Sequence, residues 1–358
     1  MKVAIIQPVV PVYREDFYKE LQKYVGVDVY VFKDSRLVEK EQTKISSFHV
    51  QHIKNKILHG FVLYNPLPLL QKKYDVLVLM QTKSHVTTWL LLLTQFVHRK
   101  KIILWGQGIT VANYDEELVK PNFLRKIQIK LSKGLWLYMD KEYQLWHKWL
   151  PKLPMKALEN TVSKADVIAD VDVYTLKTSL KEKYGIVQNK VIVFCARFET
   201  SPRRTDLLVE TIEKLDSKEF AFIIIGDGRD KPDFSKYKNV FEFGSVYDQS
   251  KKTELFTMAD IYFQPGWVGL SIVEAMAYAK PICTFARSKE TLQCVEYSYI
   301  QPNVNGLIFK DMDDCIRQFN QVSLEKFREM GENARKLVKN HLTPQNMARN
   351  AWSVLKSL

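Results

Sequence analysis

Residues Ala259–Ile282 read ADIYFQPGWVGLSIVEAMAYAKPI, and this stretch decides the fold. It opens with an apolar run typical of a buried strand, continues through a loop that contains Gly266 and Gly269, and enters a helix that carries Glu274. Gly-rich turns from a strand into a helix let backbone N–H groups approach a phosphate. Glu274 lies about one turn into that helix, where a carboxylate could bind the paired hydroxyls of a ribose. A capped helix with an exposed glutamate would explain the pattern equally well.

Similar units occur on both sides of this stretch, because short β-branched runs alternate with helical patterns along the whole chain. This alternation is typical of parallel α/β sheets. Strands are predicted in the first half at residues 3–6, 27–32, 75–79, 101–104 and 135–138. A second series is predicted at residues 190–194, 220–225, 240–243, 261–263, 281–285 and 307–309.

A chain of 358 residues exceeds the size at which single cores stop growing, so two domains are expected. A polar stretch near residue 165 interrupts the pattern of units. We therefore predict one domain at residues 1–165, a second at 166–342, and a final helix at 343–358 that follows a break at Pro344 and packs back on the first domain.

Composition excludes several classes of protein. The four cysteines form no CxxC pair, which makes a metal site or a disulfide scaffold improbable and fits a reducing cytoplasm. The first ten residues predict a strand and a loop, not a signal peptide. The longest apolar segment, residues 89–97, is far short of the roughly twenty residues that span a bilayer. We expect a soluble or peripheral protein.

The net charge of +13 is concentrated in the first half of the chain. Residues 1–160 hold 25 Lys and Arg against 14 Asp and Glu, which gives +11. The asymmetry indicates an anionic partner: a membrane surface, a phosphorylated acceptor or nucleic acid. A solvated basic face is the plainer explanation. Basic clusters between residues 96 and 136 are interleaved with Phe, Ile, Leu and Trp, however, and this mixture favours an interfacial surface.

The 259–282 stretch closely resembles the donor-site signature of the retaining glycosyltransferases of family four. Glu274 matches the second Glu of that family's paired-glutamate motif, and Gly266 stands where the first Glu belongs. The loop resembles the P-G-x-V-G-L variant that some members carry. The resemblance implies that the donor is bound by this loop and the start of its helix, namely by Gly266, Trp267, Val268, Gly269, Leu270, Ser271 and Glu274.

A second resemblance covers residues 191–208, VIVFCARFETSPRRTDLL, which match the family's strand followed by G-R and a lysine. Arg197 falls on the Arg and Arg203 on the Lys, and both are implied to be catalytic. Departure of a nucleoside diphosphate builds negative charge on a phosphate, which fixed guanidinium groups stabilise. Arg204 is a rival for the role of Arg203. Further on, the loop of Gly244, Ser245 and Val246 matches the place where the family holds the base.

The first half carries weaker resemblances. Residues 7–17 look like Q-P-x-x-P-x-Y-R-x-x-F, which implies an acceptor-side role for Gln7, Tyr13 and Arg14. Leu104–Gly108 reads LWGQG, similar to L-W-G-H-G, whose His faces the reacting centre. Gln107 stands at the His position, and its amide can form hydrogen bonds but cannot act as a general base. A plain loop residue is about as good an explanation for Gln107.

Together these resemblances imply a GT-B fold: α/β, with two Rossmann-like domains whose parallel sheets face each other across a cleft. They imply a retaining, metal-independent hexosyl transfer, without a cofactor, from a nucleotide-diphosphate sugar to a glycan or lipid-linked acceptor. With the charge pattern, we expect a cytoplasmic enzyme of bacterial surface polysaccharide or lipopolysaccharide biosynthesis, peripheral on an anionic membrane and without a nucleic-acid partner.

Several alternatives remain open. A catalytically silent member of the same family is the most serious, because two side-chain positions have changed. A nucleotide-sugar epimerase is less well supported, since it needs carboxylates and a His near the anomeric carbon. No RRM, KH or zinc pattern supports nucleic-acid binding. A dehydrogenase would carry GxGxxG after the first strand, where this chain reads QPVVP.

Overall fold

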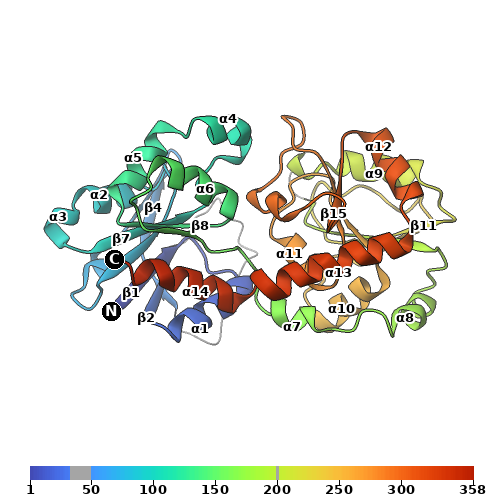
Figure 1. The fold of residues 1–358 in the computed structure, drawn as a ribbon, viewed down its shortest axis with the longest axis horizontal. Coiled ribbons are helices and arrows are strands. Elements are labelled where there is room, and N and C mark those ends of the chain that lie inside the picture. Colours follow the sequence, from blue (N-terminus) through green and yellow to red (C-terminus); the bar gives the residue numbers. More distant parts are fainter. Residues whose placement is uncertain (33–49, 199–200) are drawn as a thin grey trace. The chain divides into compact units, whose positions relative to one another are not determined.

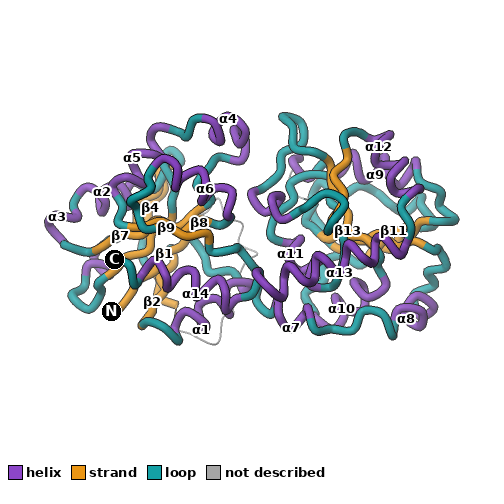
Figure 2. The backbone as a smooth tube through the Cα atoms, viewed as in Figure 1, coloured by secondary structure: helices purple, strands orange, loops and turns teal. Residues whose placement is uncertain are grey.

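The computed structural model describes residues 1–32, 50–198 and 201–358. The chain divides into two compact units: unit 1 comprises Met1–Ser163 and Thr343–Leu358, and unit 2 comprises Lys164–Leu342. Each unit is an α/β assembly built on a parallel sheet (Figure 1). Figure 2 shows the strands at the centre of each unit with helices and loops around them. The predicted α/β fold with two Rossmann-like units is confirmed.

Unit 1 contains a seven-stranded parallel sheet in the order β3-β2-β1-β6-β7-β8-β9. The central strands are almost continuous runs of Val, Ile and Leu, as expected where helices cover both faces of a sheet. The strands are β1 (Lys2–Gln7), β2 (Gly26–Val31), β3 (Val50–His52), β6 (Val76–Met80), β7 (Lys101–Gly106), β8 (Gly134–Leu137) and β9 (Met155–Ala157).

A separate hairpin of unit 1 joins β4 (Asn55–Leu58) to β5 (Phe61–Tyr64) through His59 and Gly60. Both turn residues have positive φ, as two-residue hairpin turns require. The helices of unit 1 are η1 (Val12–Arg14), α1 (Glu15–Gln22), η2 (Leu67–Leu70), α2 (Val86–Leu93), α3 (Gln95–His98), η3 (Val111–Asn113), α4 (Tyr114–Val119), α5 (Phe123–Leu131), α6 (Asp140–Trp149) and α14 (Pro344–Leu355).

The C-terminal helix α14 belongs to unit 1 and packs against α1, β8 and β9. Pro344 occupies its first turn, and the Thr343 hydroxyl caps it by accepting a hydrogen bond from the Asn346 backbone N–H at 3.1 Å. A proline tolerates this position because the first N–H groups of a helix have no intrahelical partner. Met347 and Ala351 lie fully buried in the same apolar cluster as strands β1 and β2. The last helix is thus part of the core of unit 1.

Unit 2 contains a six-stranded parallel sheet in the order β12-β11-β10-β13-β14-β15. Its strands are β10 (Lys190–Cys195), β11 (Phe220–Ile225), β12 (Val240–Glu242), β13 (Ile261–Phe263), β14 (Ile282–Phe285) and β15 (Gly306–Phe309). Its helices are α7 (Ala165–Ala169), α8 (Lys177–Lys183), η4 (Ser201–Arg203), α9 (Thr205–Lys214), α10 (Gln249–Met258), α11 (Ser271–Ala277), η5 (Val295–Tyr299), α12 (Met312–Gln321) and α13 (Leu324–His341).

Part of the stretch between residues 96 and 136, which the sequence predicts to form an interfacial surface, is buried in unit 1. Arg125 is 7% exposed, hydrogen-bonds Thr110 at 2.6 Å and pairs with Glu117 at 3.4 Å. Trp136 and Ile129 are fully buried. The reason is periodicity, since α5 turns Arg125 and Ile129 inward together. These residues belong to the interior of unit 1, and an interfacial surface has to be built from others.

Candidate functional site

The two motif-bearing loops of unit 2 start at the point where its strand order reverses. Strands β10 and β13 are neighbours, with β11 and β12 beyond β10 and with β14 and β15 beyond β13. In open α/β sheets, ligands bind outside the carboxyl ends of the strands at such a switch point. Arg197 follows the end of β10, and Pro265 follows the end of β13. The fold therefore brings the predicted diphosphate and donor loops to one edge of the sheet.

Two fully buried glutamines hold the loop after β13. The amide nitrogen of Gln264 donates to the carbonyls of Gly266 and Trp267 at 3.1 and 2.6 Å, and its oxygen accepts from the Ser271 hydroxyl at 3.2 Å. The side-chain oxygen of Gln293 accepts from the Val268 N–H at 2.7 Å. Because these bonds take up the loop's own polar groups, the loop has one defined shape.

Gly266 has no room for a side chain. A Cβ atom there would lie 2.5 Å from the Pro202 carbonyl oxygen and 2.8 Å from Cγ of Arg204. The Arg204 side chain extends over the glycine and is fixed by Asp206 at 2.7 Å and by the Thr291 hydroxyl at 2.7 Å. The structure thus explains the glycine at this position: the η4 turn occupies the space. Arg204, with its ion pair to Asp206, is engaged in this packing.

Arg203 is a partly buried cation for which the described residues provide no counter-ion. Its side chain makes no hydrogen bond or ion pair with any other residue that the structure describes. Burial lowers the pKa of Arg203 from its usual value, and the nearby charge of Arg197 lowers the pKa further. An uncompensated and partly desolvated guanidinium is energetically costly, and a bound anion would relieve that cost. The arrangement suits a phosphate at the switch point.

Glu274 lies near the start of α11, mostly buried, and has a partner that the sequence did not suggest. The Lys252 ammonium, from α10, donates to both oxygens of the Glu274 carboxylate at 3.0 and 3.1 Å. Lys252 was missed because a single lysine inside a helix gives no local signal. The pairing fixes the rotamer of Glu274 and leaves part of the carboxylate free to accept hydrogen bonds.

The remaining predicted donor residues lie at the same edge of the sheet. Gly244, Ser245 and Val246 follow β12, and the Gly244 carbonyl accepts from the Gly226 N–H at 2.7 Å. Gly244 has a positive φ of 60°, which favours glycine. Gly269 and Leu270 complete the loop before α11, and a Cβ at Gly269 would meet nothing closer than 3.8 Å.

In unit 1 three glutamines end three neighbouring strands. Gln7 is the last residue of β1, Gln81 follows β6 and Gln107 follows β7. The side-chain oxygen of Gln81 accepts from the Gly108 N–H at 3.0 Å, but its buried amide nitrogen has no hydrogen-bond partner in the part of the chain that the structure describes. Gly108 has φ of 74° and no room for a Cβ beside Trp146. Gln107 therefore sits in a fixed turn, half-exposed, without a side-chain hydrogen bond among the described residues.

Sequence reasoning missed Gln81, although its position immediately after an apolar strand is a usable signal. Of the other predicted acceptor-side residues, Tyr13 is exposed. Arg14 is buried, with its guanidinium 5.3 Å from the ring centre of Trp105 and 5.5 Å from that of Tyr138. Its N–H also contacts the Met347 sulfur at 3.4 Å. The position of Arg14 fits a packing role in unit 1 as well as an acceptor-side role.

Residues 189–323 match the family model of the group 1 glycosyl transferases. The matched segment runs from β10 through α12, so it includes the loops of Arg203 and Gly266 and the residue Glu274. No curated protein sequence matches the chain.

Solved structures resemble the whole chain. Anabaena HepE in complex with UDP has a TM-score of 0.67 at 15% identity, with 100% of both chains covered. The lipopolysaccharide outer core galactosyltransferase WaaB, in its apo form, has a TM-score of 0.68 at 13% identity, with 100% of this chain and 99% of that chain covered. A glycosyltransferase from Rickettsia africae has a TM-score of 0.65 at 17% identity, with 99% and 98% covered. At these identities the likeness establishes the GT-B fold.

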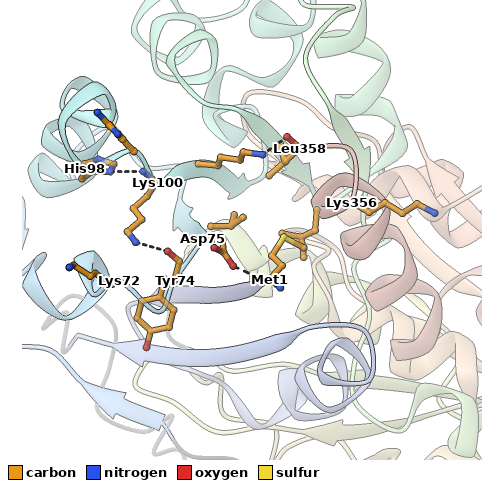
Figure 3. A pocket seen from close by; sticks show the side chains of 12 residues that line it. Met1, Lys72, Tyr74, Asp75, His98, Lys100, Lys356 and Leu358 are labelled. Atoms are coloured by element: carbon orange, nitrogen blue, oxygen red, sulfur yellow. Dashed lines mark hydrogen bonds and ion pairs between the residues drawn. The ribbon is translucent and has the colours of Figure 1, made fainter.

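Unit 1 contains a cavity of about 690 Å³ at the amino ends of its strands β6 and β7, the opposite edge of its sheet from Gln7, Gln81 and Gln107 (Figure 3). It is lined by the starts of β6 and β7 and by residues of both termini. Much of its lining is paired internally: the Lys100 ammonium donates to the Tyr74 carbonyl at 2.6 Å, and the Met1 amino group lies 3.9 Å from Asp75. Ligands of open α/β sheets bind at the carboxyl ends of the strands, so this cavity is separate from the candidate site.

Proposed function

We propose that the chain is a glycosyltransferase that binds a nucleotide-diphosphate sugar at the switch point of unit 2. The observation that carries the proposal is the pair of arginines after β10: Arg203 is partly desolvated, lies close to the charge of Arg197 and has no counter-ion among the described residues. Both lie within the segment that matches the group 1 glycosyl transferases. Glu274, held by Lys252, supplies a carboxylate for the ribose hydroxyls. The loop of Gly244, Ser245 and Val246 holds the base through backbone contacts.

The two arginines act on the leaving group. As the bond between the sugar and the diphosphate breaks, negative charge grows on the phosphate oxygens. Arg197 and Arg203 stabilise that charge, and a site already stripped of water makes each charge interaction stronger. We propose that the reaction retains the anomeric configuration, proceeds without a metal and transfers a hexose. A leaving phosphate oxygen then helps to deprotonate the acceptor hydroxyl, which enters on the same face.

For unit 1 we propose an acceptor-binding role, with Gln7, Tyr13, Arg14 and Gln107 on the acceptor side. Gln107 contributes hydrogen bonds and no proton transfer. The acceptor is a glycan, and the first candidates are the lipid-linked glycans of bacterial surface polysaccharide or lipopolysaccharide synthesis. In that setting the enzyme works in the cytoplasm, peripheral on the inner face of an anionic membrane.

Calorimetric titration with a panel of nucleoside diphosphates and their sugars tests the donor proposal. HepE has been solved with UDP and with UDP-glucose, so uridine nucleotides are the first probes. Turnover is then measured with a polyprenyl-diphosphate-linked acceptor, and the anomeric configuration of the product is read by NMR. Binding of a nucleotide sugar, followed by transfer with retention, is expected. A chain that binds none of the nucleotides would refute the proposal.

A catalytically silent nucleotide-sugar-binding protein is the second candidate. Two observations favour it: the η4 turn fills the space beside Gly266, and Gln107 stands where relatives carry a His. This candidate predicts nucleotide binding without transfer to any acceptor and without slow hydrolysis of the donor. A nucleotide-sugar epimerase is less well supported, and it would interconvert sugars in the absence of an acceptor.

A further inference from the structure

Helix α2 (Val86–Leu93) presents apolar side chains on the side where a surface helix is normally polar. Leu91 and Leu92 are buried against unit 1, as expected. Leu90 and Leu93, on the opposite side, are 52% and 58% exposed. A surface helix with apolar side chains on its outer side exposes apolar area to water, which is energetically unfavourable.

The elements beside α2 extend this apolar surface. Helices α3 and α5 both contact α2, and Figure 1 shows the three together on unit 1. On α3, Phe96 is 81% exposed and Val97 is also exposed; on α5, Phe123 is 72% exposed and Leu124 is also exposed. We call these six side chains the apolar face: Leu90, Leu93, Phe96, Val97, Phe123 and Leu124. Large aromatic rings at such exposure mark a surface that is covered in use.

Cations without acidic partners among the described residues lie on or next to the helices of the apolar face. Between residues 50 and 110 the sequence holds eight Lys and Arg and a single acid, Asp75. Arg99 directly follows α3, and Lys130 lies on α5. Arg99 and Lys72 line the cavity of Figure 3. The side chains of these three residues form no hydrogen bond or ion pair with other described residues.

We propose that the apolar face docks on an anionic lipid bilayer, with Leu and Phe side chains in the boundary between headgroups and acyl chains and with the surrounding cations on the lipid phosphates. Charge complementarity selects this occupant: Arg99 and Lys130, which form no ion pair with other described residues, lie on or next to the helices that carry the apolar side chains, and this combination matches an anionic headgroup layer above hydrocarbon. The proposal specifies the surface and the mode of the membrane contact. It does not depend on the sugar-transfer chemistry.

Insertion and simple electrostatic adsorption differ in their response to salt. Adsorption through charges alone is screened and lost as ionic strength rises. Buried apolar area is insensitive to screening, so part of the binding persists at high salt. Neither mode needs a spanning segment, and among the described residues no helix is long and apolar enough to cross a membrane.

The test is co-sedimentation of the full chain with vesicles of phosphatidylcholine mixed with phosphatidylglycerol, and with phosphatidylcholine alone. The double variant Leu93→Gln/Phe96→Gln should lower the partition coefficient on mixed vesicles at least tenfold, equivalent to about 1.4 kcal/mol. The matched control Val187→Gln/Tyr247→Gln removes two equally exposed apolar side chains from unit 2 and should bind as the wild type does. Arg99→Glu/Lys130→Glu should weaken binding at low salt only.

Three outcomes would overturn the proposal. The wild type could fail to sediment with mixed vesicles at low salt, or the Leu93→Gln/Phe96→Gln variant could bind as well as the wild type. The third outcome is a wild-type dimer that this double variant dissociates in sedimentation velocity, which would make the apolar face an interface between copies of the chain. Circular dichroism of every variant, and nucleotide titration where the wild type binds, exclude unfolding as the cause.

Discussion

The loops that follow the carboxyl ends of the strands are hydrogen-bonded differently in the two units. In both, a glutamine directly after a strand fixes a glycine-containing loop: Gln264 after β13 in unit 2 and Gln81 after β6 in unit 1. All polar groups of the Gln264 side chain are used within the loop. The buried amide nitrogen of Gln81 has no acceptor within residues 1–32, 50–198 and 201–358. The Gln264 side chain therefore has all its hydrogen bonds within unit 2, whereas the Gln81 amide nitrogen in unit 1 still needs an acceptor.

The charges at the two edges differ more sharply. The unit 2 edge brings together Arg197, Arg203 and the Lys252–Glu274 pair. The corresponding strand ends of unit 1 carry the neutral amides of Gln7, Gln81 and Gln107. Partly desolvated cations bind an anion strongly, whereas neutral amides exchange hydrogen bonds with water at little net gain. The comparison predicts tight, charge-driven binding in unit 2 and weaker, hydroxyl-directed binding in unit 1.

Removing a cation from the unit 2 edge should therefore have the largest effect. We expect Arg203→Ala to lower turnover by a factor on the order of 10²–10³, or about 2–4 kcal/mol of transition-state stabilisation, because developing phosphate charge loses a fixed donor. The control Arg229→Ala removes an arginine that is largely exposed in the same unit and should be neutral. Steady-state kinetics with the donor found by titration provides the measurement. Equal turnover of the two variants would place Arg203 outside the reaction.

The Lys252–Glu274 pair should contribute to stability in a pH-dependent way. Burial lowers the pKa of Lys252, but the Glu274 carboxylate and Cys195 outweigh burial, so the net pKa lies above its ordinary value of 10.5. A raised pKa means that the stabilisation is fully present below the unfolded-state pKa and is lost as pH rises through the folded-state pKa. We expect Lys252→Met to lower the free energy of unfolding by about 2 kcal/mol at neutral pH. This loss is smaller than the loss on breaking a fully buried ion pair, because the Lys252–Glu274 pair is partly exposed.

The measurement for Lys252 is urea denaturation of both proteins at neutral pH and again above pH 10.5. The gap between wild type and variant should shrink at the higher pH. Lys326→Met breaks a surface pair with Glu329 and should change stability by less than about 1 kcal/mol. A gap for Lys252→Met that stays constant across this range would mean that lost packing, and not lost charge, explains the effect.

The sequence predicted the fold through its long apolar strands and failed where structure depends on distant partners. Strands β1, β6, β10 and β11 are uninterrupted runs of apolar residues, which explains why they were found. The three-residue edge strands β3 and β9 were missed, because only pairing with a neighbour makes them strands. The β4–β5 hairpin was also missed. Residues 33–49 and 199–200 lie outside the described residues.

In the candidate site, too, local motifs were predictable from the sequence and contacts between distant residues were not. Gly266 and Glu274 belong to one continuous motif, so their proximity followed from the sequence. Lys252 lies 22 residues before its partner Glu274. Gln293 lies 25 residues after its partner Val268. No local sequence pattern predicts either contact. The charge of Arg125 suggested a surface position. Arg125 and Ile129 are four residues apart in α5, however, so they lie on the same, buried side of the helix.

Two glycines of the donor loop give a sharper test of the unit 2 edge, with an intermediate effect. Gly266→Ala would place a methyl group 2.5 Å from the Pro202 carbonyl and so displace the η4 turn that carries Arg203. We expect a loss of nucleotide affinity of about 1–3 kcal/mol, in the range of overpacking costs. Gly269→Ala meets nothing closer than 3.8 Å and should bind normally. Calorimetric titration measures the nucleotide affinity of both variants. Equal affinities would show that the η4 turn can move without weakening nucleotide binding.

The smallest effect is expected at the unit 1 edge. Gln107→Ala removes one neutral hydrogen-bonding group from the turn between Gly106 and Gly108. We expect turnover to fall by about tenfold or less, near 1 kcal/mol, because a neutral hydrogen bond contributes no more than this net of water. Nucleotide affinity should not change, since the amide lies in the unit without the donor loops.

The pH dependence of turnover separates hydrogen bonding from proton transfer at Gln107. An amide does not titrate, so wild type and Gln107→Ala should share the same pH–rate profile, displaced vertically. Asn113→Ala, a nearby exposed amide in η3, is the matched control and should retain full turnover. If Gln107→Ala instead lowered nucleotide affinity as strongly as Arg203→Ala does, the contrast between a charged edge and a neutral edge would be wrong. The donor would then have to engage unit 1 as tightly as it engages unit 2.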